Sequence, residues 1–122
     1  MTKTILAVDD SPSVRQMVRL TLTGAGYRVV EAVDGEDALA KASEGPIDAI
    51  LTDQNMPRLD GIGFIRRFRE TRAALGVPIV FLSTESHAEL KAQAKAAGAT
   101  GWMVKPFDQA QLLAVVRKMV GA

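Results

Sequence analysis

Three acidic residues and one lysine follow apolar runs that read as short buried strands. Asp53 ends one such run, Asp9 and Asp10 follow a second, and Lys105 follows a third. In an open α/β sheet the carboxyl ends of the strands form the edge where ligands bind. A lone aspartate at a strand end is more often a helix cap or a turn residue. Four charged residues at three strand ends instead predict a site.

The chemistry of such a site follows from its charge. Carboxylates that lie close together repel, and each raises the proton affinity of the others unless a cation joins them. A hard divalent cation with oxygen ligands relieves this repulsion, and Mg²⁺ binds through one or two carboxylates together with waters and phosphate oxygens. The cluster of Asp9, Asp10 and Asp53 therefore favours a divalent cation such as Mg²⁺. The ordinary alternative for Lys105 is a surface cation at a strand end.

The elements that position these residues alternate along the chain. Strand patterns at 4–8, 27–32, 48–53, 79–82 and 101–104 are each followed by a helical pattern. A repeated β–α order with short loops predicts an α/β fold of the (βα)5 type, with a parallel sheet covered by helices on both faces.

Capping residues and apolar spacing mark the helices. Ser11 before Pro12 suits a helix start, and Asp108 with Gln111 is spaced as a capping box. The third helix is expected to turn its apolar residues inward and its arginines outward. These are Ile62, Ile65 and Phe68 on the inner face, and Arg66, Arg67 and Arg69 on the outer face.

Bulk composition excludes several classes of protein. The 122 residues are enough for one domain, and 15 basic against 14 acidic residues leave a net charge of +1. Nothing in this balance favours nucleic acid or an anionic membrane as a partner. With 0 cysteines the chain can form no disulfide or thiolate metal site. No apolar run is long enough to span a bilayer and no signal peptide is visible, so a cytoplasmic protein is expected.

Four motifs carry a resemblance to a known family. They are Val-Asp9-Asp10-Ser, Thr-Asp53-Gln-Asn-Met-Pro57-x-x-Asp-Gly61, the strand end at Ser83, and Gly-Ala followed after five residues by Lys105-Pro106-Phe107. The chain resembles the receiver domain of bacterial response regulators over essentially its whole length, 1–122. With no output domain after Ala122, it is similar to the stand-alone, CheY-like kind. The resemblance implies a flavodoxin-like sheet of strand order 2-1-3-4-5.

The resemblance also implies a reaction. Asp53 would accept a phosphoryl group from a histidine kinase, CheA-like, or from a phosphotransfer domain, and carboxylate nucleophiles of this kind are known. Mg²⁺ would be held by Asp10, Asp53 and the backbone carbonyl of Asn55, with Asp9 acting through water. Lys105 and Ser83 would contact the phosphoryl group.

A switch is implied by Ser83 and Trp102. In the family a hydroxyl at the Ser83 position turns toward the phosphoryl oxygens and is coupled to an aromatic side chain on the fifth strand. Here that position holds Trp102, where Tyr or Phe is usual. An indole is larger and carries a donor that needs a partner, so a fixed surface or interface anchor is an equal alternative.

Other positions have narrower implied roles. Asn55 and Glu85 each lie two residues beyond a site residue, where the family tunes the access of water to the acyl phosphate. The bond before Pro106 is a candidate cis peptide. His87, the one histidine, is expected to be an ordinary surface residue.

The implied output surface is the face of the fourth helix, fifth strand and fifth helix, around Lys91, Lys95, Trp102 and 109–119. Chemotaxis, with the flagellar motor switch as partner, and a monomeric state are expected. A phosphate sink and a phosphorelay intermediate remain alternatives, as does a binding module without chemistry. A small phosphatase of the haloacid dehalogenase type is another, although that family has an acid where this chain has Asn55. We expect no enzyme activity beyond self-phosphorylation and self-dephosphorylation.

Overall fold

The computed structural model describes residues 2–71, 75–84 and 88–121, and its strands and helices alternate as the sequence predicts. The elements are β1 (Thr4–Val8), α1 (Pro12–Gly24), β2 (Arg28–Ala32), α2 (Gly35–Ser43), β3 (Ala49–Asp53), α3 (Gly61–Arg69), β4 (Ile79–Ser83), α4 (Ala88–Ala97), β5 (Gly101–Val104) and α5 (Gln109–Val120). Within the described ranges, no helix combines the length and apolar character needed to cross a membrane.

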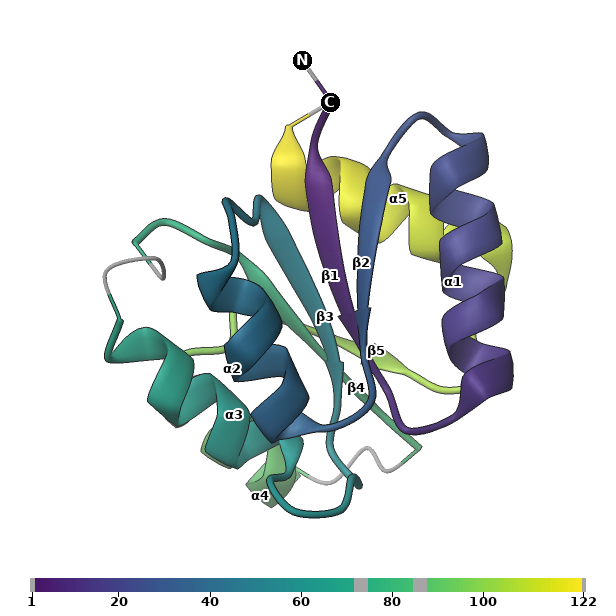
Figure 1. Cartoon of the computed structure of the whole chain (residues 1–122). Helices are drawn as coiled ribbons and strands as arrows, with labels where there is room; N and C mark the ends of the chain where they lie inside the picture. The colour runs from purple at the N-terminus through teal and green to yellow at the C-terminus, as the bar shows by residue number, and fades with distance from the viewer. Residues whose placement is uncertain (1, 72–74, 85–87, 122) are drawn as a thin grey trace.

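The five strands form one parallel sheet in the order β2-β1-β3-β4-β5. The predicted fold class and strand order are therefore confirmed. Helices α1 and α5 cover one face of the sheet, and α2, α3 and α4 cover the other (Figure 1). The central strands β3 and β4 are buried along their whole length, as expected for strands with helices on both sides.

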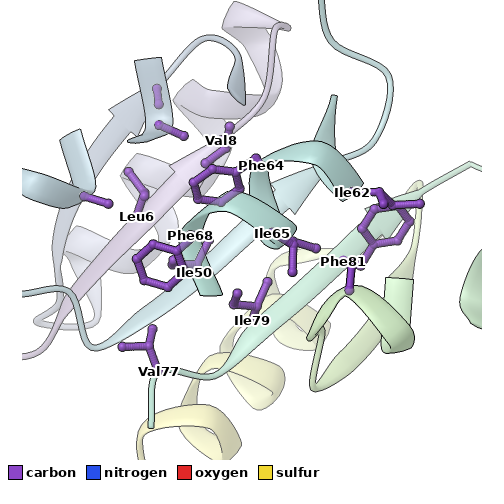
Figure 2. Close-up of a cluster of buried hydrophobic side chains, with 14 of the residues drawn as sticks. Leu6, Val8, Ile50, Ile62, Phe64, Ile65, Phe68, Val77, Ile79 and Phe81 are labelled. Atoms are coloured by element: carbon purple, nitrogen blue, oxygen red, sulfur yellow. The ribbon is translucent and has the colours of Figure 1, made fainter. Parts of the chain in front are cut away.

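Two clusters of buried apolar side chains fill the layers on either side of the sheet. On the side of α3, the rings of Phe64 and Phe68 lie near Leu6 and Ile50 of the sheet (Figure 2). Burying apolar area contributes about 25 cal/mol per Å², and the aromatic side chains bring the largest areas. Phe64 and Phe68 also stack with ring centroids 5.8 Å apart. This packing fixes α3 firmly against the sheet.

Helix starts follow the predicted capping chemistry. Pro12 begins α1 after Ser11, whose side chain accepts from Val14 N. Asp108 and Gln111 form the predicted capping box at α5. Each cap satisfies backbone N–H groups that have no partner inside the helix.

Three strand boundaries differ by one residue from the prediction. The third strand begins at Ala49 and not at Asp48, whose N donates to Thr4 O at 2.9 Å. The second strand begins at Arg28 and not at Tyr27, because Tyr27 N donates to Leu22 O and closes the end of α1. The fourth strand extends to Ser83, whose carbonyl accepts from Lys105 N at 2.9 Å.

One predicted surface residue has a different environment. Arg66 and Arg67 are exposed as expected, but Arg69 is partly buried, and the prediction that it faces solvent was wrong. Its Nε and Nη2 donate to Gly98 O at 3.1 and 2.9 Å. Gly98 has a φ of +121°, and a Cβ there would lie 2.7 Å from Arg69 Cγ. The guanidinium thus caps the end of α4, which favours a basic group.

Candidate functional site

The register of the sheet brings the predicted site residues to one edge. Val8 of β1 pairs with Thr52 of β3, so Asp9, which follows β1, lies next to Asp53 at the end of β3. Ser83 pairs with Val104, and Lys105 follows directly. All four charged and polar groups lie at carboxyl ends of strands, where open α/β sheets bind ligands.

Lys105 joins two of the acids. Its Nζ lies 2.7 Å from Asp9 Oδ2 and 3.3 Å from Asp53 Oδ1. Asp9 is 3% exposed and Asp53 8% exposed, so these ion pairs are shielded from water. Charges in such an environment interact more strongly than exposed charges do. Lys105 is therefore the principal cation that balances the buried carboxylates in the described part of the chain.

The pKa values reflect this balance. Burial, and then the negative charge of Asp9, raise the pKa of Asp53 above the ordinary aspartate value, although Lys105 and the N–H of Gln54 oppose the shift. Burial lowers the pKa of Lys105, but its hydrogen bond to Asp9 and the charges of Asp9 and Asp53 outweigh burial and leave the pKa above the ordinary lysine value. Lys105 therefore stays charged, but its charge does not fully offset the burial of ionised Asp53 and the repulsion from Asp9.

The acids are placed to hold a divalent cation. One carboxylate oxygen from each of Asp9, Asp10 and Asp53 lies within 4.8 Å of the others. Asp10 is exposed, so it borders solvent, while Asp9 and Asp53 are buried. Oxygen ligands and an open side suit Mg²⁺, which keeps several waters. The raised pKa of Asp53 shows that more positive charge would be favourable here, so the residues fit Mg²⁺.

The loop that carries Asp9 and Asp10 is fixed by backbone contacts. Asp9 Oδ1 accepts from Ser11 N at 2.9 Å, and Asp9 O accepts from Arg15 Nη1 at 2.7 Å. Glu31 of β2 holds Arg15 through an ion pair of 3.5 Å. Arg15 is not recognisable as a site residue from the sequence, because its contact depends on how α1 is rotated over the sheet.

The N-terminus of α3 presses against Asp53. A Cβ at Gly61 would overlap with Asp53 O and lie 3.0 Å from Gln54 Cα, so a side chain at this position would force the backbone to shift. Gly61 N also donates to Gln54 O at 3.1 Å. Gly61 ends the motif that begins at Thr52 and Asp53, and the close approach of the two backbones is the physical reason for a glycine there.

Gly61→Ala is expected to destabilise the protein by about 2 kcal/mol, because the new methyl group must push α3 away from the Asp53 backbone. Urea denaturation measures the loss. Gly24→Ala is the matched control, since Gly24 also lies at a helix end but has nothing within 4 Å of a built Cβ. Equal unfolding midpoints for the two variants would contradict the proposed crowding.

The remaining predicted site residues lie as follows. Ser83 is buried at the end of β4 and Asn55 is exposed in the loop after β3. The Lys105–Pro106 peptide bond is cis. Glu85 and His87 lie outside the described residues. The implied roles of Ser83, Asn55 and Glu85 stay predictions.

Trp102 is partly buried. Its ring centroid lies 5.0 Å from that of Phe81, and Lys91 Nζ lies 5.4 Å from its ring. Its Nε1 is buried and, within the described part of the chain, has no hydrogen-bond partner. A cavity of about 240 Å³ between α4 and β5 is lined by Trp102, Lys91 and Lys95, residues of the predicted output face. Both roles of Trp102, the switch and the fixed anchor, stay predictions.

Comparison with known families identifies the class of protein. Residues 5–117 match the response regulator receiver domain. The chain therefore belongs to this family, as the motifs at Asp53 and Lys105 indicated.

Solved structures agree with this assignment. The chain is 45% identical to the Vibrio cholerae chemotaxis protein CheY4, with a TM-score of 0.94 over 98% of this chain and 99% of that chain. It is 30% identical to the receiver domain of the sensor histidine kinase PA1611 from Pseudomonas aeruginosa, with a TM-score of 0.91 over 100% of both chains. That receiver holds a magnesium ion in its active-site cleft.

Curated relatives are larger proteins. The chain is 40% identical over 101 residues to a gliding motility regulatory protein of Myxococcus xanthus, covering 83% of this chain and 13% of that protein. It is 34% identical over 116 residues to the DNA-binding transcriptional regulator RpaA of Synechocystis, covering 95% of this chain and 48% of that protein. The chain spans about half or less of the length of the curated relatives that it matches.

Proposed function

We propose that Asp53 accepts a phosphoryl group from the phosphohistidine of a kinase or phosphotransfer domain. The observation that carries this proposal is the placement of a buried carboxylate beside a charged lysine, with Lys105 Nζ 3.3 Å from Asp53 Oδ1. Membership of the receiver family supports it. The raised pKa of Asp53 adds support, because perturbed ionisable groups concentrate at functional sites.

The chain's own residues supply position and charge. A carboxylate oxygen of Asp53 forms the new bond to phosphorus while the phosphorus–nitrogen bond breaks and its electron pair stays on the departing imidazole. Lys105 stays ionised and balances negative charge on the phosphoryl oxygens. Gln54 N donates to Asp53 Oδ1 at 2.9 Å and orients the carboxylate. Phosphoryl transfer needs little more than such positioning and charge balance.

Mg²⁺ is the proposed cofactor, and Asp10, Asp53 and the Asn55 carbonyl would hold it, with Asp9 acting through water. When bound it would neutralise charge on the phosphoryl group as a Lewis acid. The magnesium-containing receiver of PA1611 supports this choice of metal. The acid cluster of this chain has the oxygen ligands that Mg²⁺ prefers.

Intact mass tests the phosphoacceptor assignment. The protein is incubated with a small-molecule phosphodonor, with and without Mg²⁺, and one added phosphoryl group is expected only when Mg²⁺ is present. Asp53→Asn should remove the adduct. Asp108→Asn is the control, because asparagine caps a helix as well as aspartate and Asp108 lies in the cap of α5. An adduct that persists in Asp53→Asn would contradict the assignment.

The proposed biological role is a switch in chemotaxis or motility. The 45% identity to CheY4 supports chemotaxis, and the gliding motility relative supports motility more broadly. We propose a CheA-like kinase as phosphodonor, and output through α4, β5 and α5, with the flagellar motor switch as one partner. A phosphate sink or a phosphorelay intermediate would use the same Asp53 chemistry. Either one is distinguished from a switch by whether phosphorylation changes partner binding.

A further inference from the structure

All four polar groups of Gln54 are hydrogen-bonded. Its N–H donates to Asp53 Oδ1 at 2.9 Å. Its carbonyl accepts from Gly61 N at 3.1 Å, and its side-chain Oε1 accepts from Ile62 N at 2.9 Å. Its side-chain Nε2 donates to Asp60 Oδ2 at 3.2 Å. One residue thus connects the carboxylate of Asp53 to the start of α3 at three points.

The helix at the other end of this connection is rigidly held. Four apolar side chains of α3 are almost completely buried: Ile62, Phe64, Ile65 and Phe68. Figure 2 shows these side chains packed over the sheet. A helix anchored in this way gives the Gln54 amide a fixed frame, because tightly packed cores transmit displacement and do not absorb it.

The side-chain contacts do more than cap the helix. Asp60 already caps α3, with Oδ1 accepting from Gly63 N at 2.8 Å. The additional bonds made by Gln54 fix the orientation of its own peptide. The N–H of that peptide points at Asp53 Oδ1, the same oxygen that lies 3.3 Å from Lys105 Nζ.

We infer that Gln54 is a positioning residue for phosphoryl transfer: its side-chain amide locks the Asp53–Gln54 peptide to α3 and so sets the rotation of the Asp53 carboxylate. This inference rests on the proposed function of Asp53 as phosphoacceptor. Gln54 acts only through Asp53 and α3. Loss of its amide would free the carboxylate to rotate about its side-chain bonds, away from the direction of attack.

Gln54→Met tests the inference. Methionine keeps the length of the side chain and removes both hydrogen bonds of the side-chain amide, those to Ile62 N and Asp60 Oδ2. At saturating Mg²⁺ and phosphodonor, the rate of Asp53 phosphorylation is expected to fall about tenfold, because a small misplacement of a reacting group can slow a reaction by up to about a hundredfold. Gln111→Met is the matched control. Gln111 Oε1 also accepts a backbone N–H at a helix start, from Asp108 N at 2.9 Å, but it belongs to the cap of α5.

Amide hydrogen exchange without Mg²⁺ gives a second readout. In Gln54→Met the amides of residues 54 and 62 should exchange faster, while those in the middle of α3 keep their protection. A phosphorylation rate equal to that of Gln111→Met would overturn the inference. If the native chain takes up no phosphoryl group, the proposed function fails. Hydrogen exchange alone then tests whether the Gln54 side chain locks the Asp53–Gln54 peptide to α3. Unchanged protection at residue 54 in Gln54→Met would overturn this locking role, and lost protection would support it.

Discussion

Lys105→Met is expected to destabilise the metal-free protein by roughly 3 kcal/mol near neutral pH, as removal of one partner from a buried ion pair usually does. Lys105 contacts both Asp9 and Asp53, so its loss leaves two buried carboxylates facing each other. Within the described residues, two backbone N–H groups then remain to balance the charges, Ser11 N at Asp9 and Gln54 N at Asp53. Urea denaturation measures the effect.

The loss should depend on pH in a defined direction. The charge of Lys105 lowers the pKa of Asp53, so the variant has an Asp53 pKa that is raised further. As the pH falls through that pKa, the Asp53 carboxyl is protonated and the repulsion disappears. The variant should therefore recover stability on acidification, and Mg²⁺ should also restore part of it.

Lys118→Met is the control for this prediction, because Lys118 is an exposed lysine of α5. Its loss should change the free energy of unfolding by less than about 0.5 kcal/mol. A Lys105→Met protein as stable as Lys118→Met, with the same pH dependence, would show that Lys105 does not balance the buried acids.

The sequence could predict the main contacts of the site because topology determines them. Asp9 and Lys105 are separated by 96 positions in the chain, yet the strand ends alone predict that both lie at one edge of the sheet. Parallel strands place their carboxyl ends together whatever their separation in sequence. The capping box of Asp108 and Gln111 was predictable for a different reason, because its partners are local.

Contacts that depend on the rotation of a helix were not predictable in this way. Arg69 and Gly98 are 29 positions apart and meet because α3 and α4 lie side by side with a particular rotation. Arg15 reaches Asp9 O for the same kind of reason. The role of Gln54 was missed although it follows Asp53 directly. The sequence signal for this role is a glutamine, with its long amide side chain, placed between a site residue and the start of a helix.

Asp53→Asn is expected to stabilise the metal-free protein by about 1 kcal/mol near neutral pH, although it removes the proposed reactive group. Burial and the charge of Asp9 make ionised Asp53 unfavourable, and asparagine keeps an oxygen that can accept from Gln54 N. Lys105 retains Asp9 as a partner at 2.7 Å. This outcome is the opposite of that expected for Lys105→Met, so the pair of variants tests the charge balance from both sides.

The sign of the pH dependence follows from the raised pKa of Asp53. Between the ordinary aspartate pKa of 3.8 and the raised value, the folded protein binds more protons at Asp53 than the unfolded chain does. The native free energy of unfolding therefore falls as pH rises through this window and levels off above it. Asp53→Asn lacks this contribution, so its advantage over the native chain should vanish at the acidic end and be complete at neutral pH.

Mg²⁺ should reverse the ranking of the two proteins. A ligand that binds only the folded state at 100 times its Kd stabilises that state by about 2.7 kcal/mol, and the native chain offers Asp9, Asp10 and Asp53 as oxygen donors. Asp53→Asn loses one anionic ligand and gains less from the ion. Unfolding of both proteins across a Mg²⁺ titration measures the crossover. A native protein that is already more stable than Asp53→Asn without metal would show that Lys105 fully compensates the buried acids, and the electrostatic reason for a cation at this edge would then be lost.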